Sequence, residues 1–240
     1  MPRARTVLPS AVYAALAVAD SVAAGKGGGA SARRLRLILK PALMPVLAVA
    51  FLDGTRGGGA GGGGAEADTR LLRTGTTAAQ ALSWGGDVAL LGTSERSFLT
   101  GVGSFSGAHA AYIAAFLSVR GQGQDYDTAG LRVALGLWLS LAPLMSFAAG
   151  RKAPALRVPV AAYATILSGM FASSRLLDPA LPQGARRTLQ AGTALFLISD
   201  SVLAAQKFLL TEPRPVLESL VMATYTAGQG LIATGVAAAT

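Results

Sequence analysis

Eight apolar runs, each about 18–23 residues long, are separated by short segments that carry most of the charges and helix breakers. An α-helix rises about 1.5 Å per residue, so runs of this length can cross the roughly 30 Å hydrocarbon core of a bilayer. The sequence therefore predicts an all-α, polytopic membrane helical bundle of about eight transmembrane helices, in a single domain over residues 1–240. The helices are expected near residues 7–24, 35–52, 74–91, 98–119, 131–149, 156–173, 188–210 and 217–238.

The charges agree with a lipid-facing surface. Charged residues make up 14% of the chain, against about 25% in soluble domains. The net charge of +9 comes from Lys and Arg in short connections such as Arg33-Arg34 and Arg151-Lys152, with no basic helix face or interleaved aromatics. Nucleic-acid binding is therefore not expected, and membrane lipids are the expected partners. An even number of spans places both termini on the same side of the cell membrane.

Two segments have special composition. Residues 54–66 hold a glycine tract (GGGAGGGG) that predicts a flexible loop, and no Gly-Lys-Ser/Thr follows it to make a phosphate-binding loop. The first apolar run follows Arg3 and Arg5 and ends in small residues, which is typical of either a secretory signal peptide or a retained helix. Because further spanning segments follow, a retained helix is favoured.

The sequence has no cysteine and a single histidine, His109. Disulfides, thiol nucleophiles and cysteine-ligated or multi-histidine zinc sites are thereby excluded. We expect no metal and no cofactor.

Three charged residues, Asp87, Asp200 and Lys207, fall inside predicted helices. Each costs about 2.5–3.5 kcal/mol at a helix centre, so together they would cost on the order of 7–10 kcal/mol if unpaired. We therefore expect these groups to face one another, water or a ligand.

The depth of the embedded polar residues favours one shared site. Successive helices alternate in direction, so a residue late in an odd helix lies level with one early in an even helix. By this criterion one half of the membrane holds Asp87, Asp200 and Lys207 from odd helices and Lys40, His109 and Tyr225 from even ones. Tyr112 lies on the stripe of His109, and Gln229 follows Tyr225 by one turn. This clustering predicts a polar intramembrane cavity.

Each residue also has a purely structural interpretation. His109 would then make a hydrogen bond between helices, and Tyr112 and Tyr225 would pack with tethered hydroxyl groups. Asp20, late in the first helix, lies in the same half of the membrane. It can join the cavity or face the headgroups, and the second alternative is favoured.

These residues carry a resemblance to the YhhN-like lysoplasmalogenase family of multi-spanning membrane proteins. The similar segments occur in the family's order and cover most of the chain from about Leu35 onward. They are Lys40-Pro41, LSWGGDVALL (82–91), FLTGVGSFSGAHAAYIAAF (98–116), PVAAYATILSGM (159–170), ALFLISDSVLAAQKF (194–208) and TYTAGQGLI (224–232).

The resemblance implies hydrolysis of the vinyl-ether bond of a lysoplasmalogen, giving a fatty aldehyde and a glycerophospho-ethanolamine or glycerophospho-choline. The implied substrate is thus a lysophospholipid. The family's two intramembrane aspartates fall on Asp87 and Asp200 here.

The residue types also suit this chemistry on their own. A vinyl ether is hydrolysed by protonating its alkene carbon, so the reaction needs a carboxylic acid and a carboxylate but no strong nucleophile or metal. Burial raises the pKa of a carboxyl group and a nearby cation lowers it, so two aspartates can divide the roles. The sequence favours Asp87 as the acid, because its helix neighbours are apolar and aromatic, and Asp200 as the carboxylate, because Lys207 follows it along its helix. Tertiary contacts can reverse the two roles, so the sequence leaves both assignments open.

Six further residues complete the predicted site as substrate-binding groups. Lys40 and Lys207 would hold the phosphate at the mouth. The water, the aspartates or the glycerol hydroxyl would be hydrogen-bonded by His109, Tyr112, Tyr225 and Gln229.

Two other classes of protein share parts of this pattern. A retinal protein would need a lysine on the seventh helix and an aspartate on the third, which Lys207 and Asp87 supply, but only 6% of the residues are aromatic. A lipid-binding or transport protein would use the same cavity without catalysis, although the two halves of the chain show no inverted repeat.

Overall fold

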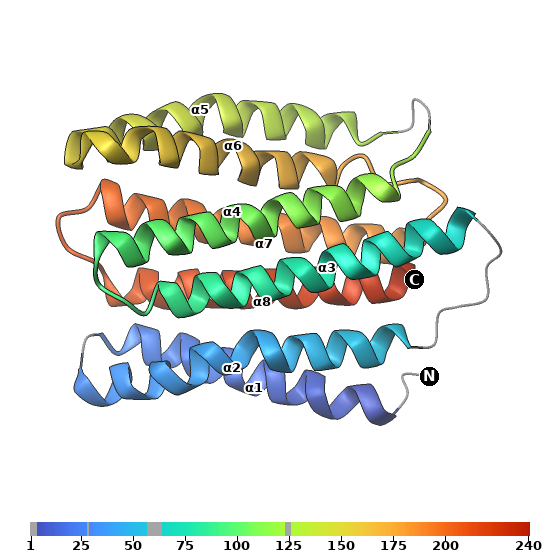
Figure 1. The fold of residues 1–240 in the computed structure, drawn as a ribbon, viewed down its shortest axis with the longest axis horizontal. Coiled ribbons are helices and arrows are strands. Elements are labelled where there is room, and N and C mark those ends of the chain that lie inside the picture. Colours follow the sequence, from blue (N-terminus) through green and yellow to red (C-terminus); the bar gives the residue numbers. More distant parts are fainter. Residues whose placement is uncertain (1–3, 28, 57–63, 123–125) are drawn as a thin grey trace.

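The structure is a computed structural model that describes residues 4–27, 29–56, 64–122 and 126–240. Within them all regular structure is helical, apart from one isolated bridge between Arg120 and Leu177. The predicted all-α bundle of eight long helices is confirmed (Figure 1). The helices are α1 (Ala4–Gly25), α2 (Ala30–Thr55), α3 (Gly64–Ala89), α4 (Glu95–Ser118), α5 (Thr128–Lys152), α6 (Arg157–Ser173, preceded by the 3₁₀ helix η1, Pro154–Leu156), α7 (Gln183–Phe208) and α8 (Pro215–Ala239).

Local signals fix several helix starts. The Ser94 hydroxyl accepts a hydrogen bond from the Ser97 N–H at 3.0 Å before α4, and the Asp127 carboxylate accepts one from the Gly130 N–H at 2.8 Å before α5. These are N-caps that satisfy donors left free in the first turn. Pro215 occupies the first position of α8, where its missing N–H costs nothing.

The third helix begins earlier than the apolar pattern predicted. α3 starts at Gly64, whereas the apolar run starts near residue 74. The predicted loop at 54–66 falls mainly on residues 57–63, which lie outside the described residues. On either side of that gap, α2 continues to Thr55 and α3 takes in the last glycine of the tract.

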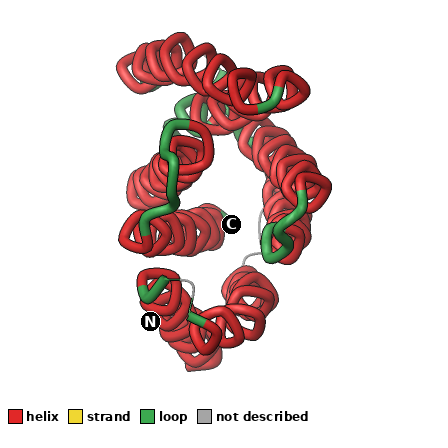
Figure 2. Tube along the Cα trace, turned by 90° about the vertical axis from the view of Figure 1, so that its left-hand side faces the viewer, coloured by secondary structure: helices red, strands yellow, loops and turns green. Residues whose placement is uncertain are grey.

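Helices that are neighbours in sequence form four antiparallel pairs, α1/α2, α3/α4, α5/α6 and α7/α8 (Figure 1). The pairs also contact one another through α1 and α8, α2 and α3, and α4 and α6, and they surround a common centre (Figure 2). The N and C ends lie at the same end of the bundle, and the odd-numbered helices finish at the opposite end (Figure 1).

Length and composition identify this bundle as a membrane protein. The spans that are long and apolar enough to cross a bilayer include α1, α2, α5, η1 with α6, and α7. The other three helices have similar lengths of 24–26 residues, and they carry several of the buried polar side chains near the centre of the bundle. Those side chains are Gln80, Ser83 and Asp87 in α3, His109 in α4, and Thr226 and Gln229 in α8.

The tightest helix contact lies between α7 and α8, where glycines bring the two backbones together. A Cβ at Gly192 would lie 2.8 Å from the carbonyl oxygen of Gly228, and one at Gly228 would lie 2.9 Å from that of Gly192. Small residues at such contacts allow close packing in membranes, where burying apolar surface supplies no drive for association. The contact fixes α8, which carries Tyr225, against α7, which carries Asp200.

We therefore expect Gly228→Ala to destabilise the protein. The added methyl group would press on the α7 backbone, and overpacking of this kind costs about 1–3 kcal/mol. Gly136→Ala in α5 is the matched control, because a Cβ at Gly136 meets no atom within 4 Å. Unfolding in detergent, followed by circular dichroism, should show the loss for Gly228→Ala alone; equal midpoints for the two variants would contradict the role of this contact.

Candidate functional site

The position of Lys40 depends on two prolines inside α2. Pro41 and Pro45 both lie within the helix, and because Pro45 has no N–H, the carbonyl oxygen of Pro41 loses its helical partner. Trp84 of α3 replaces it, since the indole Nε1–H donates to the Pro41 carbonyl oxygen at 3.0 Å. Hydrocarbon offers no water to satisfy a free carbonyl. This bond therefore ties α2 to α3 beside Lys40 and one turn before Asp87.

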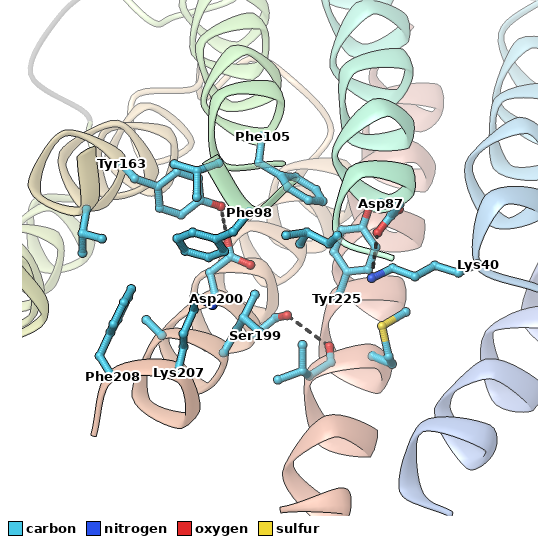
Figure 3. Close-up of a pocket in the computed structure, with 17 residues that line it drawn as sticks. Lys40, Asp87, Phe98, Phe105, Tyr163, Ser199, Asp200, Lys207, Phe208 and Tyr225 are labelled. Atoms are coloured by element: carbon cyan, nitrogen blue, oxygen red, sulfur yellow. Dashed lines mark hydrogen bonds and ion pairs between the residues drawn. The ribbon is translucent and has the colours of Figure 1, made fainter. Parts of the chain in front are cut away.

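Asp87 is buried, with 1% of its surface exposed, and receives partners from two other helices. The Tyr225 hydroxyl of α8 donates to Oδ2 of Asp87 at 2.7 Å, and the Lys40 Nζ lies 3.5 Å from Oδ1 (Figure 3). Burying a carboxylate costs free energy unless it is paired and hydrogen-bonded. Here α2 brings the counter-charge and α8 brings the hydrogen-bond donor.

Asp200 of α7 has a different set of partners. The Tyr163 hydroxyl of α6 donates to Oδ2 of Asp200, and Nε2 of His109 lies 3.0 Å from the Tyr163 oxygen and 3.5 Å from Oδ2 of Asp200. Because the Tyr163 proton is directed to Asp200, the Tyr163 oxygen accepts from His109, and Nε2 carries the imidazole proton. The three side chains form a chain of hydrogen bonds from α4 through α6 to α7.

Both aspartates line one cavity (Figure 3), which has a volume of about 80 Å³. Its remaining polar lining includes Lys40, Tyr163 and Tyr225, and most of the wall is apolar and aromatic. The apolar lining is made by Leu90, Phe98, Val102, Phe105, Val160, Leu203, Ala204, Phe208, Val221 and Met222. Within the described residues no three His, Asp or Glu side chains gather into a group that could hold a metal ion.

Tyr112 and Gln229 belong to a neighbouring buried network, outside the lining of this cavity. The Tyr112 hydroxyl donates to Oε1 of Gln229 at 2.6 Å, and Nε2 of Gln229 donates to the Ser83 hydroxyl at 2.9 Å. Ser83 precedes Asp87 by one turn. The network therefore braces the segment of α3 that carries Asp87.

The lysine that pairs with an aspartate is Lys40, and not Lys207, which follows Asp200 along α7. Lys207 lines the cavity, but its Nζ lies 4.1 Å from the centroid of the Phe98 ring, and in the described part of the chain no carboxylate oxygen lies within 4.0 Å of it. Lys40 pairs with Asp87 instead. The reason for assigning the carboxylate role to Asp200 was a nearby Lys207, and that reason is wrong, because the counter-charge accompanies Asp87.

The same pairing removes the basis of the retinal interpretation. That interpretation requires Asp87 to serve as the partner of a lysine on α7. In this structure Asp87 faces Lys40 of α2, and the ammonium group of Lys207 lies over an aromatic ring.

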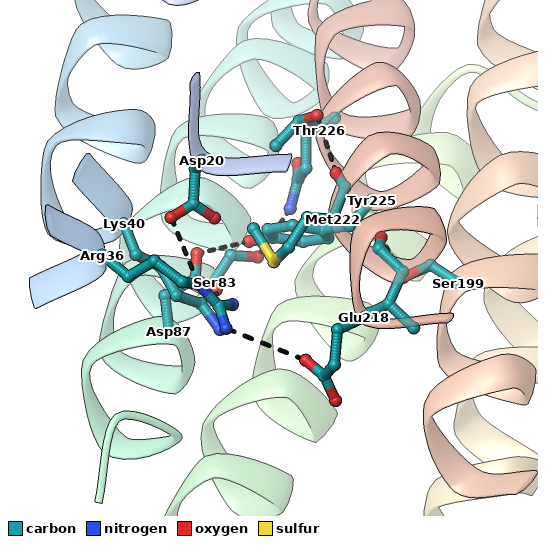
Figure 4. A network of polar contacts seen from close by, with 12 residues as sticks. Asp20, Arg36, Lys40, Ser83, Asp87, Ser199, Glu218, Met222, Tyr225 and Thr226 are labelled. Carbon is teal, nitrogen blue, oxygen red and sulfur yellow. Dashed lines mark hydrogen bonds and ion pairs between the residues drawn. The ribbon is translucent and has the colours of Figure 1, made fainter. Parts of the chain in front are cut away.

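The expectation that Asp20 faces the headgroups is also wrong. Asp20 is fully buried, with 0% exposure, and Oδ1 lies 3.4 Å from Nε of Arg36 in α2 (Figure 4). The register of α1 on α2 turns this late residue toward the interior of the bundle, where an arginine one turn before Lys40 meets it.

Tyr163 is the site residue that the sequence analysis missed, although it lies in one of the segments quoted for the resemblance. It is the only tyrosine in a mostly apolar helix, and by itself it forms no aromatic or charged stripe. The depth criterion would have found it, because Tyr163 falls early in an even helix and thus in the same half of the membrane as Asp200.

We expect the Trp84–Pro41 bond to be measurable as a coupling between two substitutions. Trp84→Phe removes the donor and should destabilise the protein by about 1–3 kcal/mol, the cost of leaving a carbonyl oxygen unsatisfied where the surroundings are hydrocarbon and not water. Pro45→Ala restores a backbone N–H at that position, which can donate to the Pro41 carbonyl, so Trp84→Phe should cost less in this background. A double-mutant cycle of unfolding free energies measures the difference; a coupling energy of zero would show that the bond does not hold α2 to α3.

Comparison with known proteins places this arrangement in one family. The family model for the YhhN family matches residues 35–236, which contain both aspartates and their partners Lys40, His109, Tyr163 and Tyr225. Neither the curated proteins nor the solved structures that were compared include a match. The matched segment covers most of the 240 residues, and the chain belongs to the YhhN family.

Proposed function

We propose that this protein hydrolyses the vinyl-ether bond of a lysoplasmalogen by acid–base chemistry of Asp87 and Asp200. The observation that carries the proposal is the pair of aspartates lining one small, largely apolar cavity, each with a different set of partners. Membership of the YhhN family and the helical membrane architecture support it.

The partners of the two aspartates suggest which is the acid. Lys40 gives an ionised Asp87 its counter-charge. Among the described residues Asp200 has no Lys or Arg nitrogen within 4.0 Å, and its Oδ2 accepts from the neutral Tyr163 hydroxyl. We therefore assign the acid to Asp200 and the carboxylate to Asp87, the reverse of the roles that the sequence suggested.

The proposed reaction balances with these two groups alone. Asp200 donates its proton to the alkene carbon that is not bonded to oxygen, and the neighbouring carbon becomes an oxocarbenium ion. A water molecule adds to that cation and gives a proton to Asp87. The product of this step is a hemiacetal. When the hemiacetal collapses, Asp87 protonates the leaving glycerol oxygen and Asp200 takes the hydroxyl proton. The products are a fatty aldehyde and a glycerophospho-ethanolamine or glycerophospho-choline, and both aspartates return to their starting states.

The hydrogen bonds around Asp200 support this cycle. When Asp200 is a carboxylate, the Tyr163 hydroxyl donates to it and the Nε2–H of His109 donates to Tyr163. This chain stabilises the negative charge that forms on Asp200 after proton transfer, in a cavity with little other polarity. The Tyr225 hydroxyl donates to Asp87 and in the same way stabilises the negative charge of that carboxylate.

We expect Asp87→Asn and Asp200→Asn each to lower the rate of aldehyde release by at least about 100-fold, since a positioned acid or base contributes roughly 10²–10⁴-fold. The assay uses protein purified in detergent and a lysoplasmenyl-ethanolamine. Asp53→Asn is the control, because Asp53 is ion-paired with Arg56 in the last turn of α2, at the other end of the bundle. Near-normal rates in both site variants would overturn the two-aspartate mechanism, and wild-type protein that binds the lipid without turnover would indicate a carrier.

Isotopes test the order of bond changes. In D₂O the aldehyde should carry one deuterium on the carbon next to the carbonyl, because Asp200 delivers a solvent-derived proton there. In H₂¹⁸O the glycerol product should contain no ¹⁸O, since water attacks the alkenyl carbon and the glycerol oxygen stays on its own carbon. Mass spectrometry of both products reads the outcome; ¹⁸O in the glycerol product would mean that a different bond is broken.

A further inference from the structure

A second cavity adjoins the first and lies nearer the end of the bundle where the odd-numbered helices finish. We call it the vestibule; it has a volume of about 750 Å³. It shares Lys40, Leu90, Phe98 and Lys207 with the wall of the inner cavity, so the two cavities adjoin. The inner cavity, at about 80 Å³, has room for only a short piece of a lipid. The rest of any amphiphile bound there has to extend outward.

The charged lining of the vestibule is mainly basic. Arg33, Arg36, Lys40 and Lys207 line it, and the acidic residue among its lining is Glu218. Two of these cations are already balanced, since Lys40 pairs with Asp87, and Arg36 lies near both Asp20 and Glu218. The other two, Arg33 and Lys207, have no carboxylate oxygen within 4.0 Å in the described part of the chain.

Arg36 is held in place by acids on two sides (Figure 4). Its Nε lies 3.4 Å from Oδ1 of the fully buried Asp20, and its Nη1 lies 3.8 Å from Oε2 of Glu218. Neither oxygen of Asp20 nor Nε of Arg36 has a hydrogen bond of good geometry among the described residues. Asp20 thus acts on Arg36 as a buried counter-charge, and it fixes a guanidinium group at the wall of the vestibule.

We infer that the vestibule binds the phosphate group of a single-chain phospholipid through Arg33, Arg36 and Lys207, with Asp20 as a positioning residue for Arg36. This inference rests on the proposed function for the orientation of the lipid, with its ether link between the aspartates and its headgroup outside. Guanidinium and ammonium groups suit a phosphate because they donate several charge-assisted hydrogen bonds to its oxygens. Lys40, which the sequence had placed on the phosphate, belongs to Asp87 instead.

The inference is tested by binding, so that no turnover is needed. The probe is a 1-O-alkyl lysophospholipid, whose saturated ether cannot be hydrolysed by alkene protonation, and the comparison is the 1-O-alkylglycerol of the same chain length, which lacks the phosphate. By isothermal titration in detergent, the phosphate-bearing lipid should bind wild-type protein at least about 10-fold more tightly, as expected for one or more charge-assisted hydrogen bonds.

Three variants locate the site. Arg33→Gln, Lys207→Gln and Asp20→Asn should each weaken binding of the lysophospholipid by about 10-fold and leave alkylglycerol binding unchanged. Arg34→Gln is the matched control, because Arg34 is exposed and does not line the vestibule. Unchanged alkylglycerol binding also shows that a variant is folded. Equal affinity for the two lipids in wild-type protein, or an equal loss in Arg34→Gln, would overturn the inference in favour of general attraction between basic residues and headgroups.

Two further experiments complete the test. One asks whether the bound phosphate belongs to a lipid, and the other distinguishes failure of the phosphate site from failure of the proposed function. Inorganic phosphate that binds as tightly as the lysophospholipid would overturn the assignment to a lipid. If the alkyl lysophospholipid binds in a phosphate-dependent manner but a vinyl-ether substrate is not hydrolysed, the proposed function fails and the phosphate site stands. If a vinyl-ether glycerol without phosphate is hydrolysed with the same kcat/KM as the lysoplasmalogen, the phosphate site fails and the proposed function stands.

Discussion

A carboxyl group inside a membrane bundle is stable only when other helices bring it hydrogen-bond partners and, where it is ionised, a counter-charge, and the interior of this protein is arranged around that requirement. Asp87 of α3 is met by Lys40 of α2 and Tyr225 of α8, and Asp200 of α7 by Tyr163 of α6 and, more distantly, His109 of α4. Each partner comes from a helix other than that of its carboxylate, so these contacts also fix how the helices are rotated against one another.

The polar groups in the interior are supplied mainly by three helices. α3, α4 and α8 carry most of the buried polar side chains of the site and of the Tyr112–Gln229–Ser83 network, and they are not among the five candidate membrane spans found in the described residues. Their place in the bundle therefore depends on contacts with neighbours more than on contact with lipid. The glycine contact between α7 and α8 and the Trp84–Pro41 bond between α3 and α2 are contacts of this kind.

The sequence was a good guide to what depends on length and depth, and a poor one to what depends on rotation. The lengths of the apolar runs predicted eight helices. The alternating direction of the helices placed Asp87, Lys40 and Tyr225 at one depth, and in the structure Lys40 and Tyr225 both contact Asp87. Which lysine meets which aspartate is set by lateral neighbours, so proximity along α7 suggested the wrong pair. Asp20 was misplaced for the same reason, because nothing in α1 alone indicates that Arg36 of α2 lies inside. A lone tyrosine such as Tyr163 makes no pattern, and only its depth marks it.

Asp20 and Arg33, which belong to the proposed phosphate site, lie earlier in the chain than the two aspartates and their partners. The YhhN match begins at residue 35, so it includes the inner cavity, from Lys40 to Tyr225, together with Arg36 and Lys207. Arg33 and the buried Asp20 precede it. The two aspartates and their partners thus lie wholly within the matched segment, whereas the vestibule also draws on the start of α2 and the end of α1. Substitutions before residue 35 should then weaken the proposed phosphate binding while leaving the contacts of Asp87 with Lys40 and of Asp200 with Tyr163 in place, because the residues of both pairs come after position 35.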